Sequence, residues 1–258
     1  MAEITVRRVL FDFADNAGLD VIPGDKKASA FWIGLSLTMP YLEPYLIRTM
    51  RSAVKDVSDP VLAEDMKRFN GQESHHYRNH ALFNDELRAK LSPGAAAEIQ
   101  QIEDELEADY QRFSAERSPR FNIGYAEGFE AMTSAMALTC FAVEMPSTCA
   151  PDFRRLVEWH LAEEIEHRTV TFEAYEHLVG GYGYRLYQGF RSQAHYLGYI
   201  RRFARCLLAE MGQASRAFYL PLLPSVVPRY FRTLTPWYHP GKIDTPAEVD
   251  RVLAKYAA

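Results

Sequence analysis

The sequence has little cysteine, and its cysteines are not spaced for chemistry. Only Cys140, Cys149 and Cys206 occur among the 258 residues, and no two of them form a CxxC pair. An odd, widely spaced set excludes a disulfide-stapled scaffold and a thiolate zinc site. We therefore expect a protein of a reducing, cytoplasmic compartment.

Long hydrophobic runs are also absent. Residues 1–8 lack the apolar core of a signal peptide, and no stretch approaches the roughly 18 apolar residues of a membrane span. The most apolar run, residues 218–227, is broken by Pro221 and Pro224. We expect no transmembrane segment and interpret this run as buried packing, with contact to a membrane surface as the alternative.

Positive charge is not in excess. The chain has 29 basic and 34 acidic side chains, which gives a formal net charge of −5. An average field of this sign repels a phosphate backbone, so we do not expect nucleic acid as a partner. In contrast, 48% of the residues are hydrophobic, which is enough to bury a core and excludes a disordered chain.

Helical periodicity dominates what is present, and strand-like alternation is sustained nowhere. Caps, prolines and apolar spacing predict helices at 40–57, 61–91, 95–116, 121–145, 151–178 and 184–211, and a short one after Pro246. We predict an irregular N-terminal arm at residues 1–28 and an aromatic C-terminal extension at residues 219–258. The expected fold is an all-α helical bundle of one domain, residues 1–258.

The helix predicted at 61–91 places ionisable side chains on its apolar face. At about 100° per residue, Glu73, His76 and His80 lie on the same side as Phe69 and Phe83. That side should face the core, where an unpaired charge costs roughly several kcal/mol. A single Glu-x-x-His pair is more often solvated than functional, but this one has inward apolar neighbours.

The helix predicted at 151–178 repeats the pattern. His160, Glu164 and His167 share one face, with Glu163 at its margin. Two Glu-x-x-His units on separate helices, each completed by one glutamate from another helix, are the arrangement of ferritin-like bundles with a dinuclear metal centre. We therefore predict a ferritin-like bundle that holds two metal ions.

Two further helices supply lone glutamates. Glu43 lies in an apolar first turn, where it could also simply complement the helix dipole. Glu130 lies in a stretch of small and apolar residues, and Glu127, one turn away, could be the ligand in its place; we favour Glu130. Imidazole and carboxylate groups without thiolate suit iron or manganese, and zinc remains possible.

His80 and His160 each lie about one turn beyond a Glu-x-x-His unit. They could bind metal directly, or they could be buried histidines bonded to a carboxylate outside the ligand set. The predicted metal ligands are Glu43, Glu73, His76, His80, Glu130, His160, Glu164 and His167. Glu127, Thr133 and Glu163 are candidates for supporting those ligands, and we predict no catalytic residue beyond the metal centre.

Several motifs resemble the family of predicted metal-dependent hydrolases, a ferritin-like group. The resemblance is carried by Arg7-Arg8-x-x-Phe11-Asp12-Phe13, Ile22-Pro23-Gly24-Asp25, Gln72-Glu73-x-x-His76-x-x-x-His80, Trp159-His160-x-x-Glu163-Glu164-x-Glu166-His167 and Tyr238-His239-Pro240. The helical motif His-x-x-Glu-Glu-x-Glu-His is the specific one. The chain departs from the family at Glu173, where an aspartate is expected.

That family in turn resembles nonheme diiron monooxygenases, such as the diterpenoid hydroxylase of platensimycin biosynthesis. The resemblance implies an O₂-dependent hydroxylase with two iron ions and additional histidines at the metal centre. It also implies a small, largely apolar substrate of the kind found in natural-product biosynthesis, a separate electron donor, and a chain that could form a homodimer. The alternative is a dinuclear metal-dependent hydrolase of an ester or phosphoester. Iron storage is a third possibility, which the bulky C-terminal extension disfavours.

Overall fold

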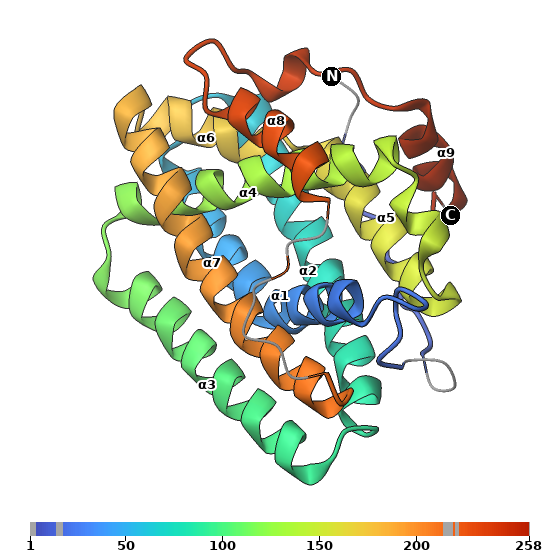
Figure 1. Cartoon of the computed structure of the whole chain (residues 1–258). Coiled ribbons are helices and arrows are strands. Elements are labelled where there is room, and N and C mark those ends of the chain that lie inside the picture. The colour runs from blue at the N-terminus through green and yellow to red at the C-terminus, as the bar shows by residue number, and fades with distance from the viewer. Residues whose placement is uncertain (1–3, 14–17, 214–218, 220–221, 258) are drawn as a thin grey trace.

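The computed structural model describes residues 4–13, 18–213, 219 and 222–257. Over these residues the protein is an all-helical bundle without any strand (Figure 1), which confirms the predicted fold class. None of the described helices has the length and apolar character needed to cross a membrane. Residues 218, 220 and 221 of the apolar run lie outside the described residues, as do residues 1–3 and 14–17 of the predicted arm.

The α-helices follow one another through most of the chain. They are α1 (Lys26–Ala53), α2 (Pro60–Arg88), α3 (Pro93–Glu116), α4 (Pro119–Ala142), α5 (Pro151–His167), α6 (Val170–Leu178), α7 (Tyr182–Glu210), α8 (Leu223–Thr233) and α9 (Ala247–Lys255). Short 3₁₀ turns occupy residues 54–56, 145–148 and 240–242. The start of α2 matches the predicted cap signal, because Asp59 accepts hydrogen bonds from the first-turn amides. Ser92 and Ser118 cap α3 and α4 in the same way.

The predicted start of the first helix is wrong. α1 begins at Lys26, where Asp25 caps it, and both Pro40 and Pro44 lie inside the helix. Proline in a helix interior removes a hydrogen bond and costs about 3 kcal/mol. Here the first half of α1 packs tightly on α7, and a Cβ on Gly34 would lie 3.3 Å from the Cβ of Phe203. Tertiary packing therefore extends the helix through positions where local propensity would end it, and it shortens the predicted arm by residues 26–28.

The single helix predicted at 151–178 is also wrong. It is divided into α5 and α6, with Arg168 and Thr169 between them. Arg168 donates hydrogen bonds to the carbonyl oxygens of Pro240 and Ile243, far along the chain. These distant contacts hold Arg168 at the point where the helix is interrupted, and the local sequence gives no signal for them.

The C-terminal part holds a helix that the sequence did not predict. α8 forms within the proline-rich segment, with Pro224 in its first turn and Pro228 further inside. The first turn of a helix tolerates proline because its amide needs no partner there. α8 packs on α4, and α9 packs on α5.

The helices that carry the predicted ligands lie around one interior region. α1 packs against α2, α4 and α7, and α4 packs against α5 and α7. The α4–α7 contact depends on a missing side chain, because a Cβ on Gly128 would lie 2.7 Å from the Cα of Gly189. This close approach presses α4 against the body of the bundle and buries Glu130, two residues further along.

Candidate metal centre

Seven of the eight predicted ligands come together in the interior as two adjoining groups. One group is formed by Glu43, His76 and His160, and the other by Glu73, Glu130, Glu164 and His167. All seven side chains are buried, and within each group the potential ligand atoms lie within 4.8 Å of one another. They are supplied by α1, α2, α4 and α5.

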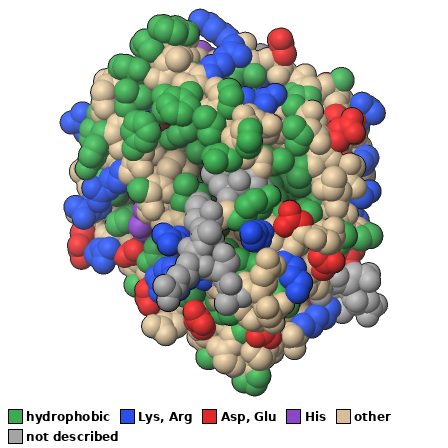
Figure 2. All heavy atoms as spheres, in the orientation of Figure 1, with side chains coloured by type: hydrophobic (Ala, Val, Ile, Leu, Met, Phe, Trp, Pro, Cys, Tyr) green, Lys and Arg blue, Asp and Glu red, His purple; other side chains and the backbone are tan. Residues whose placement is uncertain are grey.

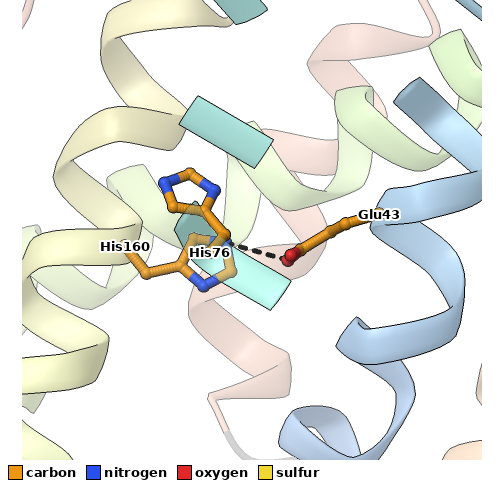
Figure 3. A group of neighbouring side chains, drawn as sticks. All are labelled: Glu43, His76 and His160. Atoms are coloured by element: carbon orange, nitrogen blue, oxygen red, sulfur yellow. Dashed lines mark ion pairs between the residues drawn. The ribbon is translucent and has the colours of Figure 1, made fainter. Parts of the chain in front are cut away.

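The first group brings a carboxylate up to a pair of stacked rings. The imidazoles of His76 and His160 lie 4.1 Å apart, centroid to centroid, at an interplanar angle of 28°. Figure 3 shows Glu43 pointing toward them from α1, with its Oε1 3.6 Å from Nε2 of His160. The three side chains thus converge on a common space.

Glu164 and Glu73 connect the two groups. Glu164 Oε1 lies 2.7 Å from Nε2 of His160, while its Oε2 lies 3.2 Å from Nε2 of His167. Glu73 Oε1 lies 3.4 Å from Nδ1 of His76 and 3.5 Å from Nε2 of His167. A carboxylate placed between two sets of ligand atoms can bridge two ions, one on each side.

The outward nitrogens of two rings are held by acceptors. Nε2 of His76 lies 2.9 Å from Oε2 of Glu163, and Nδ1 of His167 lies 2.9 Å from Oε1 of Gln72. Since these oxygens accept, each ring donates from its outward nitrogen, and when the ring is neutral Nδ1 of His76 and Nε2 of His167 carry no hydrogen on the side of the carboxylates. Burial acts to lower the pKa of both rings, but in the absence of a cation the carboxylates around them outweigh it and raise the pKa of His76 to about 9. Hydrogen bonds of this kind orient metal-binding histidines.

His80 does not reach the carboxylates and instead fixes the ring of His160. Ser36 donates its hydroxyl hydrogen to Oδ1 of Asn84, so it accepts from Nδ1 of His80 at 2.8 Å. Nε2 of His80 is then an acceptor for Nδ1–H of His160 at 2.7 Å. Burial, and then the neighbouring imidazole, lower the pKa of His80 and keep it neutral. In the neutral ring, the relay places the lone pair of His160 on Nε2, the atom that lies 2.7 Å from Oε1 of Glu164.

The three predicted supporting residues have different surroundings. Glu163 accepts from His76 and also forms an ion pair with Arg7. Glu127 pairs with Arg185 at 3.2 Å and belongs to neither group of potential ligands. Thr133 donates to the carbonyl oxygen of Phe129 and lines a cavity beside the metal centre.

Several residues around the site carry no assigned role in the sequence-based prediction. Gln72 and Arg7 belong to the motifs quoted above, so the sequence offered a signal for them. Ser36, Asn84 and Arg185 offered none, because each reaches the site from a helix position that looks like ordinary packing.

Like charges crowd the centre. Burial raises the pKa of Glu43 well above its usual value, and Glu73 and Glu164 raise it further. Burial and Glu164 do the same to the pKa of Glu130. Burial acts to raise the pKa of Glu164 as well, but the nearby imidazoles, that of His167 foremost, outweigh it and hold this pKa well below its usual range. One or more cations among these groups would relieve the repulsion.

Buried polar atoms without a hydrogen-bond partner also indicate a site for cations. They are both carboxylate oxygens of Glu43, Oε1 of Glu73, Nδ1 of His76 and Oε1 of Glu130. A buried polar group without a hydrogen bond costs about 1–3 kcal/mol. Five such atoms in one cluster are therefore unusual and are explained by bound metal ions. Their nitrogen and oxygen donors fit iron, manganese or zinc.

An apolar cavity of about 60 Å³ adjoins this centre. His160 and Glu164 form part of its wall, and the rest is mostly aromatic and aliphatic, including Met132, Met136 and Tyr196. The volume is well below the roughly 150 Å³ of a cavity that holds benzene. A substrate of that size or larger can therefore enter only if flexible side chains, such as the methionines, move.

Comparison with known proteins gives a match at the level of a family. A family model described as predicted metal-dependent hydrolase matches residues 5–244, which is more than half of the chain. No curated protein and no solved structure matches. The description agrees with the resemblance seen in the sequence motifs. It favours the hydrolase alternative over the oxygenase interpretation, and no comparison supports a likeness to diiron monooxygenases.

Proposed function

Since the chain belongs to the family of predicted metal-dependent hydrolases, we propose that it is an enzyme that holds two metal ions in this centre and acts on a small, apolar substrate. The observation that carries the proposal is the pair of buried donor groups joined by Glu73 and Glu164. Four buried carboxylates together with three oriented imidazoles make a costly arrangement unless cations neutralise it.

The ligands divide between two positions. Glu43, Nδ1 of His76 and Nε2 of His160 would hold one ion, and Glu130 and Nε2 of His167 the other. Glu73 and Glu164 would contact both. His80 is in this proposal a positioning residue for His160. Bound ions would supply Lewis acidity toward a carbonyl or phosphoryl group or, if redox-active, the capacity to activate O₂.

Hydrolysis of an ester is the first candidate reaction, because the family description names hydrolysis. The cavity decides between the substrates expected of a hydrolase. A charged phosphoester would lose its hydration in a wall of aromatic and aliphatic side chains, whereas a neutral ester with an apolar acyl group would not.

O₂-dependent hydroxylation is the second candidate, and the cavity favours it too. The polar lining residues outside the centre are few, among them Thr133 and Gln193. A hydrocarbon group needs no polar partner, and the apolar wall would exclude water while it lies beside His160 and Glu164. Such a reaction would require an external electron donor.

One experiment tests the metal centre and separates the two reactions. Protein purified under air is analysed for metals, and about two transition ions per chain are expected. The apo-protein is then loaded with Zn²⁺ or Mn²⁺ and assayed on nitrophenyl esters of short apolar acids. In parallel it is loaded anaerobically with Fe(II) and mixed with O₂ while oxygen uptake is recorded.

Ester cleavage that requires the metal, together with an Fe(II) form that is inert to O₂, would establish the hydrolase. Rapid, stoichiometric oxygen uptake without ester cleavage would replace it with the oxygenase. A protein that binds no metal in either form contradicts both.

A further inference from the structure

The face formed by α7 and α8 exposes large apolar side chains to solvent. Tyr187 and Phe190 project from α7, Phe231 from α8, and Trp237 from the segment that follows. Phe190 is 56% exposed, Phe231 60% and Trp237 77%. Figure 2 shows hydrophobic side chains gathered where Figure 1 places α8 and the neighbouring part of α7. We call this surface, with Leu223, the α7–α8 face.

α8 is apolar on its outer side as well as on its inner side. Val226 and Tyr230 are buried against the bundle, while Leu223 and Phe231, two turns apart, face outward. Thr233 is also buried on the inner side, and Arg232 is exposed. A helix that lies on a protein surface in water normally turns polar side chains outward. α8 therefore has the character of a helix that lies at an apolar interface.

The charge of this part of the chain is opposite to that of the whole. Residues 182–242 contain nine basic side chains and one acidic one, Glu210, whereas the full sequence has 29 basic and 34 acidic. Two of the nine, Arg185 and Arg202, form ion pairs with Glu127 and Glu105 and add no net charge. Aromatic and aliphatic side chains bordered by arginines are the composition of interfacial membrane-binding helices. An anionic lipid surface attracts each such basic residue by about 1 kcal/mol.

The same two helices form a wall of the cavity beside the metal centre. Val226 of α8 lines it, and so do Tyr196 and Leu197 of α7. Leu223 and Phe231 thus lie on the outside of the helix whose inside closes the cavity. Movement of α8 relative to α7 would connect the cavity with whatever the α7–α8 face contacts.

We infer that the α7–α8 face docks on an anionic lipid bilayer, with α8 in the plane of the interface, and that the apolar substrate enters the cavity from the bilayer between α7 and α8. The docking stands on the exposed side chains and the charge alone. Only the entry route rests on the proposed function.

Two other occupants fit the face less well. A second copy of the chain, paired about a two-fold axis, would place two basic faces against each other, which costs association energy. Single-stranded nucleic acid would use the arginines and aromatic rings, but Leu223 and the exposed Pro224 offer it nothing to stack on.

Trp237 gives a direct test. The chain has three tryptophans, and the other two, Trp32 and Trp159, are buried at 1% and 0% exposure. The full chain is mixed with vesicles of phosphatidylcholine alone or with about a third phosphatidylglycerol, and both tryptophan emission and cosedimentation are measured. We expect binding to the anionic vesicles with a shift of emission to shorter wavelength. Trp237→Phe should abolish the shift and keep the binding.

Matched substitutions separate apolar and charge contributions. Phe190→Ser/Phe231→Ser should weaken partitioning about tenfold or more, and Arg232→Ser about fivefold. Val61→Ser/Leu82→Ser removes comparably exposed side chains from α2 and should leave partitioning unchanged. Arg51→Ser on α1 is the corresponding charge control.

The docking is overturned if neither vesicle binds the chain, or if the two phenylalanine substitutions leave partitioning unchanged. Binding to an oligonucleotide but not to vesicles, or a dimer that buries Trp237 in the absence of lipid, would overturn it in favour of that occupant. Metal content is measured on the same variants and should be unaffected. A wild-type chain that holds two metal ions but binds no vesicle contradicts the docking alone. A wild-type chain that binds anionic vesicles but holds no metal contradicts the proposed function alone.

Discussion

Two polar clusters lie along α1 and α4, and they differ in how completely their atoms are paired. One is the candidate metal centre. The other, which we call the tyrosine cluster, consists of Tyr45, Tyr110, Tyr125, His195 and Asp109. Tyr45 is two residues from Glu43 on α1, and Tyr125 is five residues from Glu130 on α4. The same pair of helices thus supports two clusters rich in ionisable groups.

Four members of the tyrosine cluster form a chain of hydrogen bonds, and Tyr45 stacks on the ring of Tyr110. The hydroxyls of Tyr110 and Tyr125 lie 3.2 Å apart, and Tyr125 contacts Nδ1 of His195 at 2.9 Å. Nε2 of His195 lies 3.0 Å from Asp109, and Tyr45 donates to Asn122. None of these atoms belongs to the buried polar atoms that lack a partner, whereas five atoms of the metal centre do.

The contrast shows that hydrogen-bond pairing, rather than residue type, distinguishes the candidate metal centre from the tyrosine cluster. A network whose atoms are all satisfied stabilises the fold and needs nothing else. A buried cluster with unpaired carboxylates and a free imidazole nitrogen is stable only with a ligand or at a cost in free energy of unfolding. Histidine is present in both clusters, so its presence alone decides nothing.

The largest effect on metal binding is expected from the removal of Glu164, which contacts both donor groups. Glu164→Ala should weaken metal binding by more than about 100-fold, beyond what the loss of a supporting residue costs. Metal analysis of the purified variant checks this, and circular dichroism should show an unchanged helical content. Tyr110→Phe in the other cluster is the control and should keep about two ions. Full metal content in Glu164→Ala would remove the basis of the assignment.

The relay to His160 gives the next effect. His80→Ala removes the acceptor for Nδ1–H of His160 and should lower metal affinity or activity about 10- to 100-fold. His195→Ala, which deletes a histidine from the tyrosine cluster, should leave metal affinity unchanged. Titration of apo-protein with the metal, competed by a chelator, measures both. Equal behaviour of the two variants would mean that His80 has only a packing role.

Substitutions in the tyrosine cluster should lower the free energy of unfolding without changing the metal content. Tyr125→Phe deletes a buried hydroxyl that links Tyr110 to His195, and should lower the free energy of unfolding by about 1–3 kcal/mol. Urea denaturation of the apo-protein gives this value, with metal content measured beside it. Loss of metal in this variant would show that the two clusters are coupled.

The smallest expected effect is a gain, rather than a loss, in the free energy of unfolding. Glu43→Gln removes a carboxyl group whose pKa is raised by burial and by its neighbours, so the apo-protein of the variant should be more stable than that of the wild type. A raised pKa means that the wild-type chain loses stability as pH rises through it; the gain should therefore be larger at pH 8 than at pH 5. Thermal unfolding of apo-protein at both pH values measures it. Added metal should stabilise the wild type more than the variant.

Local sequence accounts for much of the fold. The caps of α2, α3 and α4 act within four residues, and helical spacing places Glu73 with His76 and Glu164 with His167 on inward faces. Three features that the local sequence did not predict depend on distant contacts. They are the continuation of α1 through Pro40 and Pro44, the interruption between α5 and α6 at Arg168, and the formation of α8 among prolines. In each case packing outweighed local propensity.

The helical fold and the inward direction of the two Glu-x-x-His units could be predicted from the sequence, because both follow from the 3.6-residue repeat of its apolar side chains. The interaction partner of each side chain, in contrast, depends on the tertiary structure. It paired Glu127 with Arg185, left Glu130 beside His167, and set His80 behind His160. A helical wheel gives the direction of a side chain but not its partner, and partners decide which polar atoms remain free to bind a metal ion.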